Sequence, residues 1–449
     1  MARMFGTDGV RGKANTELTP EMAMQIGRAG AYALAGSAGR APKVMIGTDT
    51  RRSADMLEAA LVAGLCSVGA KVYLAGVVPS PAMAHLVRQY ELDAGIMLSA
   101  SHNPMPDNGI KFFDGKGYKL SDSLEDEIEA LCSERANEIP RPVGIGVGHC
   151  FPCESATEDY VEFLLSTITG KKPFAGLRIA LDCANGATYQ AAPIAFRKLG
   201  AEVFFIHSAP DGSNINEGCG STHLGSLRDY VKARGLDIGL AFDGDGDRML
   251  CVDDTGAEMD GDVIMAVCGL AMQKKGNLNN NAIVATVMSN MGLQLMCREQ
   301  GITLHQTSVG DRYVIEKMRE GGYNLGGEQS GHIIFGDYNT TGDGILTGLQ
   351  LLAILKESGQ KMSELRRVME PLPQVLLNAE LSGRNKYVET EPITNAIAEA
   401  DKQLAGEGRI LVRPSGTEPL VRVMIEGREQ SAIDKMATEL VTLIEKELS

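Results

Sequence analysis

The chain has 449 residues, of which 44% are hydrophobic and 22% charged, a composition typical of a soluble globular protein with several domains. Its formal net charge of −15 argues against nucleic acid as a partner and against a general attraction to anionic membranes. No apolar run approaches the roughly 18 residues of a membrane helix, the beginning "MARMFGTDGVRG" lacks signal-peptide character, and the nine scattered cysteines fit reduced thiols, so we expect a cytoplasmic protein.

Three segments of the chain share one plan. Each reads as a strand, a polar turn, an amphipathic helix, a glycine that ends the helix and a second strand. The helix-ending glycines are Gly69, Gly200 and Gly301. The segments begin, from Lys43, Leu177 and Ala282, with "KVMIGTDTRRSADMLEAAL", "LRIALDCANGATYQAAPIAF" and "AIVATVMSNMGLQLMCREQG". The repetition predicts three mixed α/β domains.

Each segment leads to a further strand that ends in a polar loop. These stretches are "DAGIMLSASHNP" from Asp93, "DIGLAFDGDGDR" from Asp237 and "GYNLGGEQSGHI" from Gly322. Ligands of open α/β sheets gather at the carboxyl ends of strands, so each domain could contribute one loop to a common cleft. The sequence after about Pro371 lacks the plan and predicts a smaller fourth domain. We expect domains over residues 1–155, 156–256, 257–370 and 371–449.

The first polar loop, "LSASHNPMPDNG" from Leu98 to Gly109, sets a serine beside a histidine. Adjacent residues of an extended strand point to opposite faces, so His102 is not expected to serve Ser101 as a local base. Ser101 must then be activated from elsewhere or be chemically modified. Taken alone, the peptide fits a strand end with an Asn-Pro turn better than a catalytic site.

The stretch "HCFPC" from His149 to Cys153 contains a C-x-x-C pattern, which could be redox-active or half of a zinc site. It lies in a Gly/Pro-rich region and no second cysteine pair accompanies it at metal spacing. We therefore expect a linker here.

The second polar loop, "DGDGDR" from Asp243 to Arg248, carries three aspartates at alternate positions. On an extended backbone they converge on one side, and unit charges about 4 Å apart repel by roughly 4 kcal/mol at an effective dielectric near 20. A divalent cation removes this repulsion, and an all-oxygen ligand set favours magnesium or calcium over zinc. An EF-hand is excluded, because Arg248 and Asp254 stand where its glycine and glutamate belong. The alternative is an Asp-Gly turn in a hairpin.

Magnesium commonly combines a few carboxylates with phosphate oxygens. A phosphoryl group on Ser101 would bring three acceptor oxygens and could complete the shell around Asp243, Asp245 and Asp247. Ser101 then needs no adjacent base, because its resting form already carries the group that it donates to a substrate.

Two further loops suit a phosphosugar. In "GGEQSGHI", Glu328 and Ser330 lie two apart and face the same side if the chain is extended, where they could bind sugar hydroxyls, and His332 on that side could move protons. In "RPSGTEP", the predicted phosphate anchor consists of a guanidinium, two hydroxyls, a glycine amide and a nearby second cation, namely Arg413, Ser415, Thr417, Gly416 and Arg422. Taken alone, "RPSGTEP" also fits an ordinary Ser-Gly turn with a surface arginine, and a lone histidine such as His332 also fits a core residue.

The chain resembles the α-D-phosphohexomutase family through five motifs spread from Asp8 to Pro419, in the order "TDGVRG", "SASHNP", "DGDGDR", "GEQSGH" and "RPSGTEP". The resemblance implies a four-domain α/β enzyme, heart-shaped around a central cleft, whose C-terminal domain is a smaller α+β domain. It implies an isomerase that exchanges phosphoryl groups between a phosphoserine and a phosphosugar through a sugar bisphosphate.

The resemblance also implies residue roles. Mg²⁺ is held by the phosphate on Ser101 with the three aspartates. The catalytic candidates are Ser101, Arg11, Lys111, His332 and His102. The substrate-binding candidates are Arg248, Glu328, Ser330, the loop "VGDR" with Gly310 and Asp311, and the anchor residues Arg413, Ser415, Gly416, Thr417 and Arg422.

The sequence gives less evidence about which sugar phosphate is the substrate than about the family. The overall similarity favours glucosamine 6-phosphate and glucosamine 1-phosphate, on the route to UDP-N-acetylglucosamine, with glucosamine 1,6-bisphosphate or glucose 1,6-bisphosphate as activator. Glucose or mannose phosphate is the alternative, since that branch shares nearly every motif but typically has Met at the position of Gln329. A metal-dependent phosphatase and a non-enzymatic cation-binding protein are further alternatives, and a homodimer is a family expectation.

Overall fold

A computed structural model of the chain describes residues 4–6, 8–35, 40–381, 388, 390–414 and 420–448. The chain divides into two compact units. The first comprises Met1–Met288 and Leu304–Arg367, and the second comprises Ser289–Thr303 and Val368–Ser449. None of the helices among the described residues combines the length and the apolar character that a membrane span requires.

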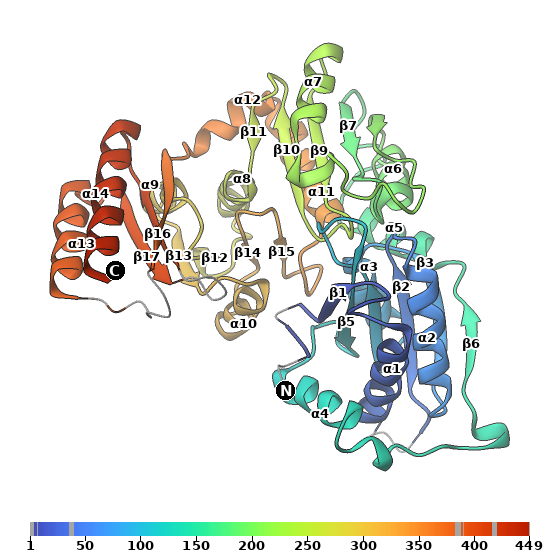
Figure 1. Cartoon of the computed structure of the whole chain (residues 1–449). Coiled ribbons are helices and arrows are strands. Elements are labelled where there is room, and N and C mark those ends of the chain that lie inside the picture. Colours follow the sequence, from blue (N-terminus) through green and yellow to red (C-terminus); the bar gives the residue numbers. More distant parts are fainter. Residues whose placement is uncertain are drawn as a thin grey trace. The chain divides into compact units, whose positions relative to one another are not determined.

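Three of the four sheets repeat one arrangement, which confirms the three predicted repeats (Figure 1). Each repeat supplies three strands, and the first of them in the chain lies in the middle, with the second on one side and the third on the other. The third strand is followed by a strand that pairs with it antiparallel. In spatial order, the first sheet has β1 (Val10–Lys13), β5 (Asp107–Asp114), β4 (Ala94–Leu98), β2 (Lys43–Thr48), β3 (Lys71–Val77) and β6 (His149–Pro152). The second has β11 (Glu258–Met259), β10 (Met249–Asp253), β9 (Ile238–Phe242), β7 (Arg178–Asp182) and β8 (Glu202–Ile206). The third has β13 (Thr303–Thr307), β12 (Ala282–Thr286), β14 (Leu325–Gly327) and β15 (Ile333–Phe335).

The helices of these repeats begin and end at local signals. The side chains of Asp260 and Asp343 cap the first turns of two of them, and the predicted helix-ending glycines Gly69, Gly200 and Gly301 all have positive φ, as such positions require. The helices are α1 (Pro20–Ala35), α2 (Ala54–Cys66), α3 (Ser80–Gln89), α4 (Asp122–Cys132), α5 (Ala156–Ser166), α6 (Thr188–Lys198), α7 (Gly225–Arg234), α8 (Gly261–Lys274), α9 (Met291–Gln300), α10 (Asp311–Gly321), α11 (Gly344–Ser358) and α12 (Met362–Leu365).

The central strands are buried along their whole length. Every residue of β4, β9 and β12 is buried, which explains why these strands read as apolar runs rather than as alternating patterns. Beside the first sheet, α1 and α2 lie against each other (Figure 1), and a Cβ on Gly64 would come within 2.2 Å of the carbonyl of Met24. The missing side chain therefore sets how closely these two helices pack.

The segment from His149 to Cys153 is not the predicted linker. Residues His149–Pro152 form β6, a parallel edge strand paired with β3. The prediction was wrong because backbone pairing with β3 compensates for a local composition that favours a loop. Cys150 and Cys153 are free, as are the other seven cysteines, which confirms the expectation of reduced thiols.

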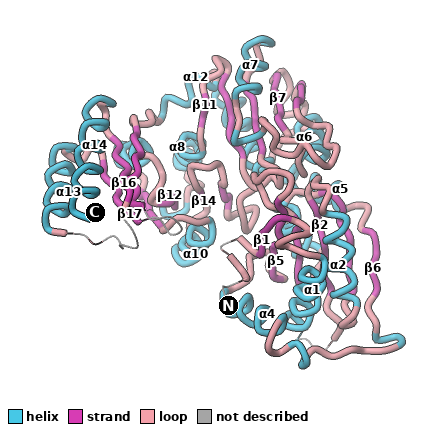
Figure 2. Tube along the Cα trace, in the orientation of Figure 1, coloured by secondary structure: helices cyan, strands magenta, loops and turns pink. Residues whose placement is uncertain are grey.

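The second unit contains an antiparallel sheet in the order β16 (Gln374–Glu380), β18 (Leu420–Glu426) and β17 (Arg409–Pro414). Helices α13 (Glu391–Leu404) and α14 (Gln430–Leu448) lie on one side of it (Figure 2). The buried carboxylate of Glu426 joins α9 to the sheet, because it accepts hydrogen bonds from the amide of Met291 at 2.9 Å and from Nε of Arg409 at 2.7 Å.

Candidate active site

Three polar loops leave the carboxyl ends of equivalent strands in the first unit, namely β4, β9 and β14. Ser101 follows β4, the aspartates Asp243, Asp245 and Asp247 follow β9, and Glu328 follows β14. Side-chain contacts join the loops, from Ser101 to Asp243 and from Asp247 to His332. The prediction that the repeated domains bring these loops together is supported by those contacts.

Ser101 lies at the centre of the site. It is 1% exposed, and its Oγ donates a hydrogen bond to Oδ2 of Asp243 at 2.6 Å. Its φ of 52° is a left-handed value that is uncommon for a residue with a side chain. Strained backbone of this kind clusters at functional sites, where the surrounding structure holds it.

The turn at Ser101 corrects the expectation about His102. Because Ser101 is left-handed rather than extended, the two side chains do not point to opposite faces, and Oγ of Ser101 lies 3.3 Å from Nδ1 of His102. Burial, together with the positive charges of Arg248 and Arg11, lowers the pKa of His102. The neutral imidazole can therefore accept a proton beside Ser101.

Arg51, which the sequence analysis did not single out, supports the Ser101 loop through hydrogen bonds to its backbone. Its buried guanidinium pairs with Asp49 and donates to the backbone carbonyls of Ser101, Asn103, Pro104 and Asp107. The planar guanidinium group presents five N–H donors and can reach all of these acceptors at once, which the compact ammonium group of a lysine cannot do. The pattern "DTRR" after β2 carried no signal for this role, because the acceptors are about fifty residues away.

We expect Arg51→Lys to lower the free energy of unfolding by about 3–5 kcal/mol, since it leaves buried carbonyls and a buried carboxylate without their partner. Urea unfolding measures the change. The neighbouring exposed Arg52 provides the control, because Arg52→Lys should stay within about 0.5 kcal/mol of wild type. Equal stability of the two variants would contradict the role of Arg51.

The three aspartates form a buried cluster in which one carboxylate oxygen of each lies within 4.8 Å of the others. Asp245 Oδ1 and Asp247 Oδ1 are buried and have no hydrogen-bond donor among the described residues. Burial, and then the charges of Asp247 and Asp245, raise the pKa of Asp243 well above its usual value. Unpartnered buried oxygens and mutual repulsion both fit a site for a hard divalent cation.

Lys111 partly balances these charges. Its buried Nζ lies 2.8 Å from Asp245 Oδ2, 3.0 Å from Asp8 Oδ2 and 3.9 Å from Asp247 Oδ2. Burial alone would lower the pKa of Lys111, but Asp245 and Asp8 outweigh it and raise the pKa above its usual value. Lys111 is therefore a fixed cation beside the aspartates. Arg11, from the same first sheet, pairs with Asp8.

His332 lies between two carboxylates. Its Nδ1 is 3.6 Å from Asp247 Oδ2, and its Nε2 is 3.6 Å from Asp311 Oδ2. Burial opposes protonation, but Asp247 and Asp311 raise the pKa of His332, whereas the amide of Gly342 donates to Nε2 and favours the neutral ring. These opposed influences suit a group that changes its protonation state. For Asp247, burial is outweighed by His332 and Lys111, so its pKa is lowered.

Lys119 and Asp8 are further members of the site that the sequence analysis missed. Nζ of Lys119 lies 2.6 Å from Asp8 Oδ1 and 2.6 Å from Asp311 Oδ2, so it joins the first domain to the start of α10. Asp8 lay in the motif "TDGVRG" but was not assigned a role, and Lys119 carried no local signal. A cavity of about 220 Å³ opens here, with Lys119, Asp311, Arg312 and His332 in its wall.

The loop after β14 is a turn, so the extended backbone on which the shared face of Glu328 and Ser330 depended is not formed. The amide of Gly331 donates to the carbonyl of Glu328, and the amide of Glu328 donates to the carbonyl of His332. Glu328 Oε1 still reaches the neighbouring loop, where it accepts from the amide of Gly310 at 3.2 Å. Ser330 Oγ is buried and without a hydrogen bond to any described residue.

Arg248 ends the aspartate loop. Its backbone amide donates to Asp243 Oδ1 at 3.1 Å, and its Nε lies 3.8 Å from Asp247 Oδ1. Burial lowers the pKa of Arg248, but Asp247 and Asp243 outweigh it and keep the side chain charged. Gln329, in contrast, donates its amide to Asp260 at 3.0 Å.

The candidates of the last motif belong to the second unit. Arg413 and Arg422 face each other across β17 and β18 as register partners, and both are partly buried. Ser415, Gly416 and Thr417 lie outside the described residues, so their predicted role stays a prediction.

Close packing joins the aspartate loop to the Ser101 loop. A Cβ on Gly244 would lie 2.5 Å from the carbonyl oxygen of Ser101 and 2.7 Å from Nδ2 of Asn216. We expect Gly244→Ala to displace Ser101 and lower kcat on the order of a hundredfold, as small misplacements of reacting groups do. Steady-state kinetics measures this, and Gly225→Ala, whose Cβ meets only Arg228 Nη2 at 3.9 Å, should retain full activity.

Comparison with known proteins gives consistent matches along the chain. Four domain families described as phosphoglucomutase/phosphomannomutase match it: alpha/beta/alpha domain I over residues 2–138, domain II over 158–256, domain III over 260–372 and the C-terminal domain over 376–443. These matches give the fold a four-domain architecture, with mixed α/β sheets in three domains and a smaller α+β domain at the C-terminus.

Two relatives are similar over their whole length. Proteins of Ruminiclostridium cellulolyticum and Acetivibrio thermocellus, each named phosphoglucosamine mutase, are 57% and 56% identical, with 100% of both chains covered. A solved structure of a phosphoglucomutase/phosphomannomutase family protein from Burkholderia thailandensis has the same fold, with a TM-score of 0.82 at 24% identity, over 100% of this chain and 98% of that one.

Proposed function

Since the chain belongs to the phosphoglucomutase/phosphomannomutase family, it is an isomerase that acts as a phosphohexomutase, and we propose that it interconverts glucosamine 6-phosphate and glucosamine 1-phosphate. The product would serve the synthesis of UDP-N-acetylglucosamine, a cell-wall precursor. The observation that carries the proposal is the placement of Ser101 Oγ 2.6 Å from Asp243, inside a buried aspartate cluster with Lys111 beside it.

Ser101 is proposed as the phosphoryl carrier. In the first half-reaction, the free hydroxyl of the sugar phosphate attacks the phosphorus on Ser101, the bond from phosphorus to Oγ breaks, and the hydroxyl proton goes to a base of the site. In the second half-reaction, Oγ attacks the other phosphate of glucosamine 1,6-bisphosphate, the bond from phosphorus to the sugar oxygen breaks, and that oxygen takes up a proton. The cycle returns the phosphoenzyme. Glucosamine 1,6-bisphosphate or glucose 1,6-bisphosphate would act as activator by phosphorylating Ser101.

Asp243, Asp245 and Asp247 are proposed to hold Mg²⁺ together with the phosphate on Ser101. The unpartnered buried oxygens of Asp245 and Asp247 and the purely oxygen donor set of the three residues support this assignment. Bound there, Mg²⁺ would neutralise negative charge on the transferring phosphoryl group.

The side chains around Ser101 are proposed to have three kinds of role: proton transfer, stabilisation of phosphate charge and substrate binding. His102 and His332 are the proposed proton carriers, because one contacts Ser101 Oγ and the other lies between two carboxylates. Lys111 and Arg11 are proposed to stabilise phosphate charge, since both are cations that pair with Asp8 beside the aspartate loop. Arg248, Gly310, Asp311, Glu328 and Ser330 are proposed sugar-phosphate contacts, and Arg413, Ser415, Gly416, Thr417 and Arg422 are proposed to bind the phosphate that is not reacting.

The names of the full-length relatives support glucosamine phosphates over glucose or mannose phosphates. Gln329 adds little to that choice, because its amide is engaged with Asp260 and has a structural role. The test is a coupled assay of glucosamine 1-phosphate formation with Mg²⁺ and a catalytic amount of bisphosphate, run in parallel with glucose and mannose phosphates. Higher kcat/KM on glucosamine phosphate supports the proposal. A preference for glucose or mannose phosphate would move the enzyme to that branch, and release of inorganic phosphate instead of isomerisation would identify a phosphatase.

We further propose a cytoplasmic location, which the nine free cysteines support, and a homodimer, which light scattering of the purified chain can test. The domain limits 1–155, 156–256, 257–370 and 371–449 remain a proposal for where the chain can be divided. No nucleic-acid or membrane partner is expected from the charge of the chain.

A further inference from the structure

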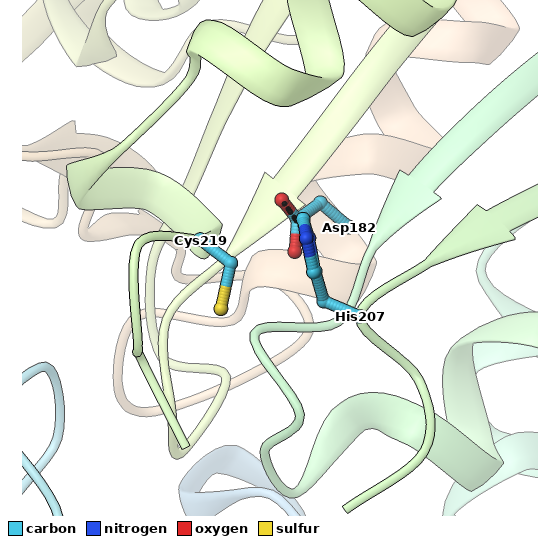
Figure 3. Close-up of side chains that lie close together, drawn as sticks. All are labelled: Asp182, His207 and Cys219. Atoms are coloured by element: carbon cyan, nitrogen blue, oxygen red, sulfur yellow. Dashed lines mark hydrogen bonds and ion pairs between the residues drawn. The ribbon is translucent and has the colours of Figure 1, made fainter. Parts of the chain in front are cut away.

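A second cluster of metal-ligating side chains lies in the domain that carries the aspartate loop (Figure 3). Asp182 is the last residue of β7, His207 directly follows β8, and Cys219 directly precedes the short turn Gly220–Thr222. One potential ligand atom from each side chain lies within 4.8 Å of the others. The cluster therefore occupies the carboxyl ends of two adjacent parallel strands, where open α/β sheets commonly bind ligands.

The distances in the cluster suit a compact ion. Nδ1 of His207 lies 3.0 Å from Oδ2 of Asp182. Ligand atoms bound tetrahedrally at about 2.0–2.3 Å lie about 3.3–3.8 Å apart, so small adjustments would bring these atoms to such a separation. Asp182 and Cys219 are fully buried, whereas the His207 side chain is 30% exposed. A fourth ligand position can thus open towards solvent on the side of His207.

The backbone around the cluster is held in unusual conformations. Ala184, Asn185, His207 and Asn216 have φ values of 52°, 46°, 45° and 60°, in the left-handed region that residues with side chains rarely adopt. The Asp182 carboxylate supports the turn at Ala184 and the neighbouring turn at Gly220, because it accepts hydrogen bonds from the amides of Ala184 at 2.9 Å and Gly220 at 3.1 Å. Such concentrated strain is typical of a functional position.

We propose that Asp182, His207 and Cys219 form a site for a zinc-type divalent ion, separate from the magnesium site at Asp243, Asp245 and Asp247. A thiolate, an imidazole and a carboxylate are the ligands that Zn²⁺ selects, while Mg²⁺ prefers oxygen ligands alone, so ligand chemistry keeps the two ions apart. Binding forms a bond from the metal to Sγ, and the thiol proton leaves to solvent. The proton between His207 Nδ1 and Asp182 leaves in the same way, and no oxidation or reduction occurs.

The site stabilises a loop that contacts the phosphoserine segment. Residues 208–219 leave His207 and return to Cys219, and Asn216 within them donates its side-chain amide to the carbonyls of Ser101 at 2.9 Å and Asn103 at 3.1 Å. An ion bound to both ends of this loop holds Asn216 in place. The three ligands are therefore positioning residues for Ser101 and do not touch the substrate.

A Cys-His-Asp nucleophile is the alternative use of these side chains, and burial argues against it. The thiol of Cys219 is fully buried, so a substrate cannot reach it.

The test uses the full-length protein, stripped of metal with a chelator and then supplied with excess Mg²⁺ to occupy the aspartates. Titration with Co²⁺ reports a thiolate ligand through its charge-transfer absorption, and elemental analysis after addition of Zn²⁺ gives the stoichiometry. We expect one equivalent of Zn²⁺ in wild type, loss of the Co²⁺–thiolate absorption in Cys219→Ala, and weaker Zn²⁺ binding by on the order of a hundredfold in His207→Asn. Asparagine tolerates the left-handed φ of position 207, so this variant keeps the backbone.

Cys268→Ala is the matched control, because Cys268 is equally buried but lies in α8 outside the cluster, and it should bind Zn²⁺ as wild type does. The proposal is overturned if wild type binds no Zn²⁺ in the presence of Mg²⁺, or if His207→Asn and Cys219→Ala bind it as tightly as Cys268→Ala. If Cys219→Ala does not fold, His207→Asn alone decides.

Discussion

We expect Ser101→Gly to abolish isomerisation, with kcat lower by on the order of 10⁴-fold or more, because the proposed phosphoryl carrier is then missing. Glycine is the informative replacement here. Ser101 has a φ of 52°, which glycine adopts without strain, so the variant removes the hydroxyl while the loop held by Arg51 and Asn216 stays in place. The coupled assay with glucosamine 6-phosphate, Mg²⁺ and bisphosphate measures the loss.

Two controls separate chemistry from folding. Ser101→Gly should match wild type in thermal unfolding, and intact-mass measurement should find a phosphorylated form in wild type only. Ser101→Ala should be equally inactive but somewhat less stable, since alanine is strained at positive φ. Activity of Ser101→Gly within tenfold of wild type would remove Ser101 from the mechanism.

Asp243→Asn has opposite effects on activity and on the stability of the metal-free protein. Asparagine can keep both hydrogen bonds, because its oxygen accepts from the amide of Arg248 and its amide group can donate to Ser101 Oγ. It removes one of three buried like charges, so the metal-free variant should be more stable at neutral pH, by roughly 1 kcal/mol or a rise in Tm of about 2–4 °C. Activity should fall on the order of 10³-fold, because the proposed Mg²⁺ site then lacks one of its ligands.

Calorimetry of Mg²⁺ binding and thermal unfolding with and without Mg²⁺ test this pair of effects. Wild type should gain stability from Mg²⁺, and Asp243→Asn should gain much less. Asp229→Asn is the control, since Asp229 is exposed on α7 in the same domain and should behave as wild type in every measurement. A metal-free Asp243→Asn protein that is less stable than wild type would show that repulsion does not dominate at this cluster.

Much of the molecule could be predicted from local pattern. The three repeats follow from periodicity and from Gly69, Gly200 and Gly301, because helix and strand periods and the left-handed conformation of glycine are properties of short segments. The convergence of Asp243, Asp245 and Asp247 also follows from local spacing, and the five motifs together indicated the family. The segment His149–Pro152 shows the limit of this reasoning, because strand β6 depends on pairing with a strand more than seventy residues earlier in the chain.

Only the tertiary structure decided which distant side chains meet. The hydrogen bond from Ser101 to Asp243 spans 142 residues of sequence, the one from Lys111 to Asp245 spans 134, and the one from Lys119 to Asp8 spans 111. No local pattern encodes such pairs, because they arise from the order and direction of strands within sheets and from the packing of one domain on the next. The left-handed turn at Ser101, which brings His102 within reach, is imposed in the same way by the contacts of Arg51, Asn216 and Gly244 around it.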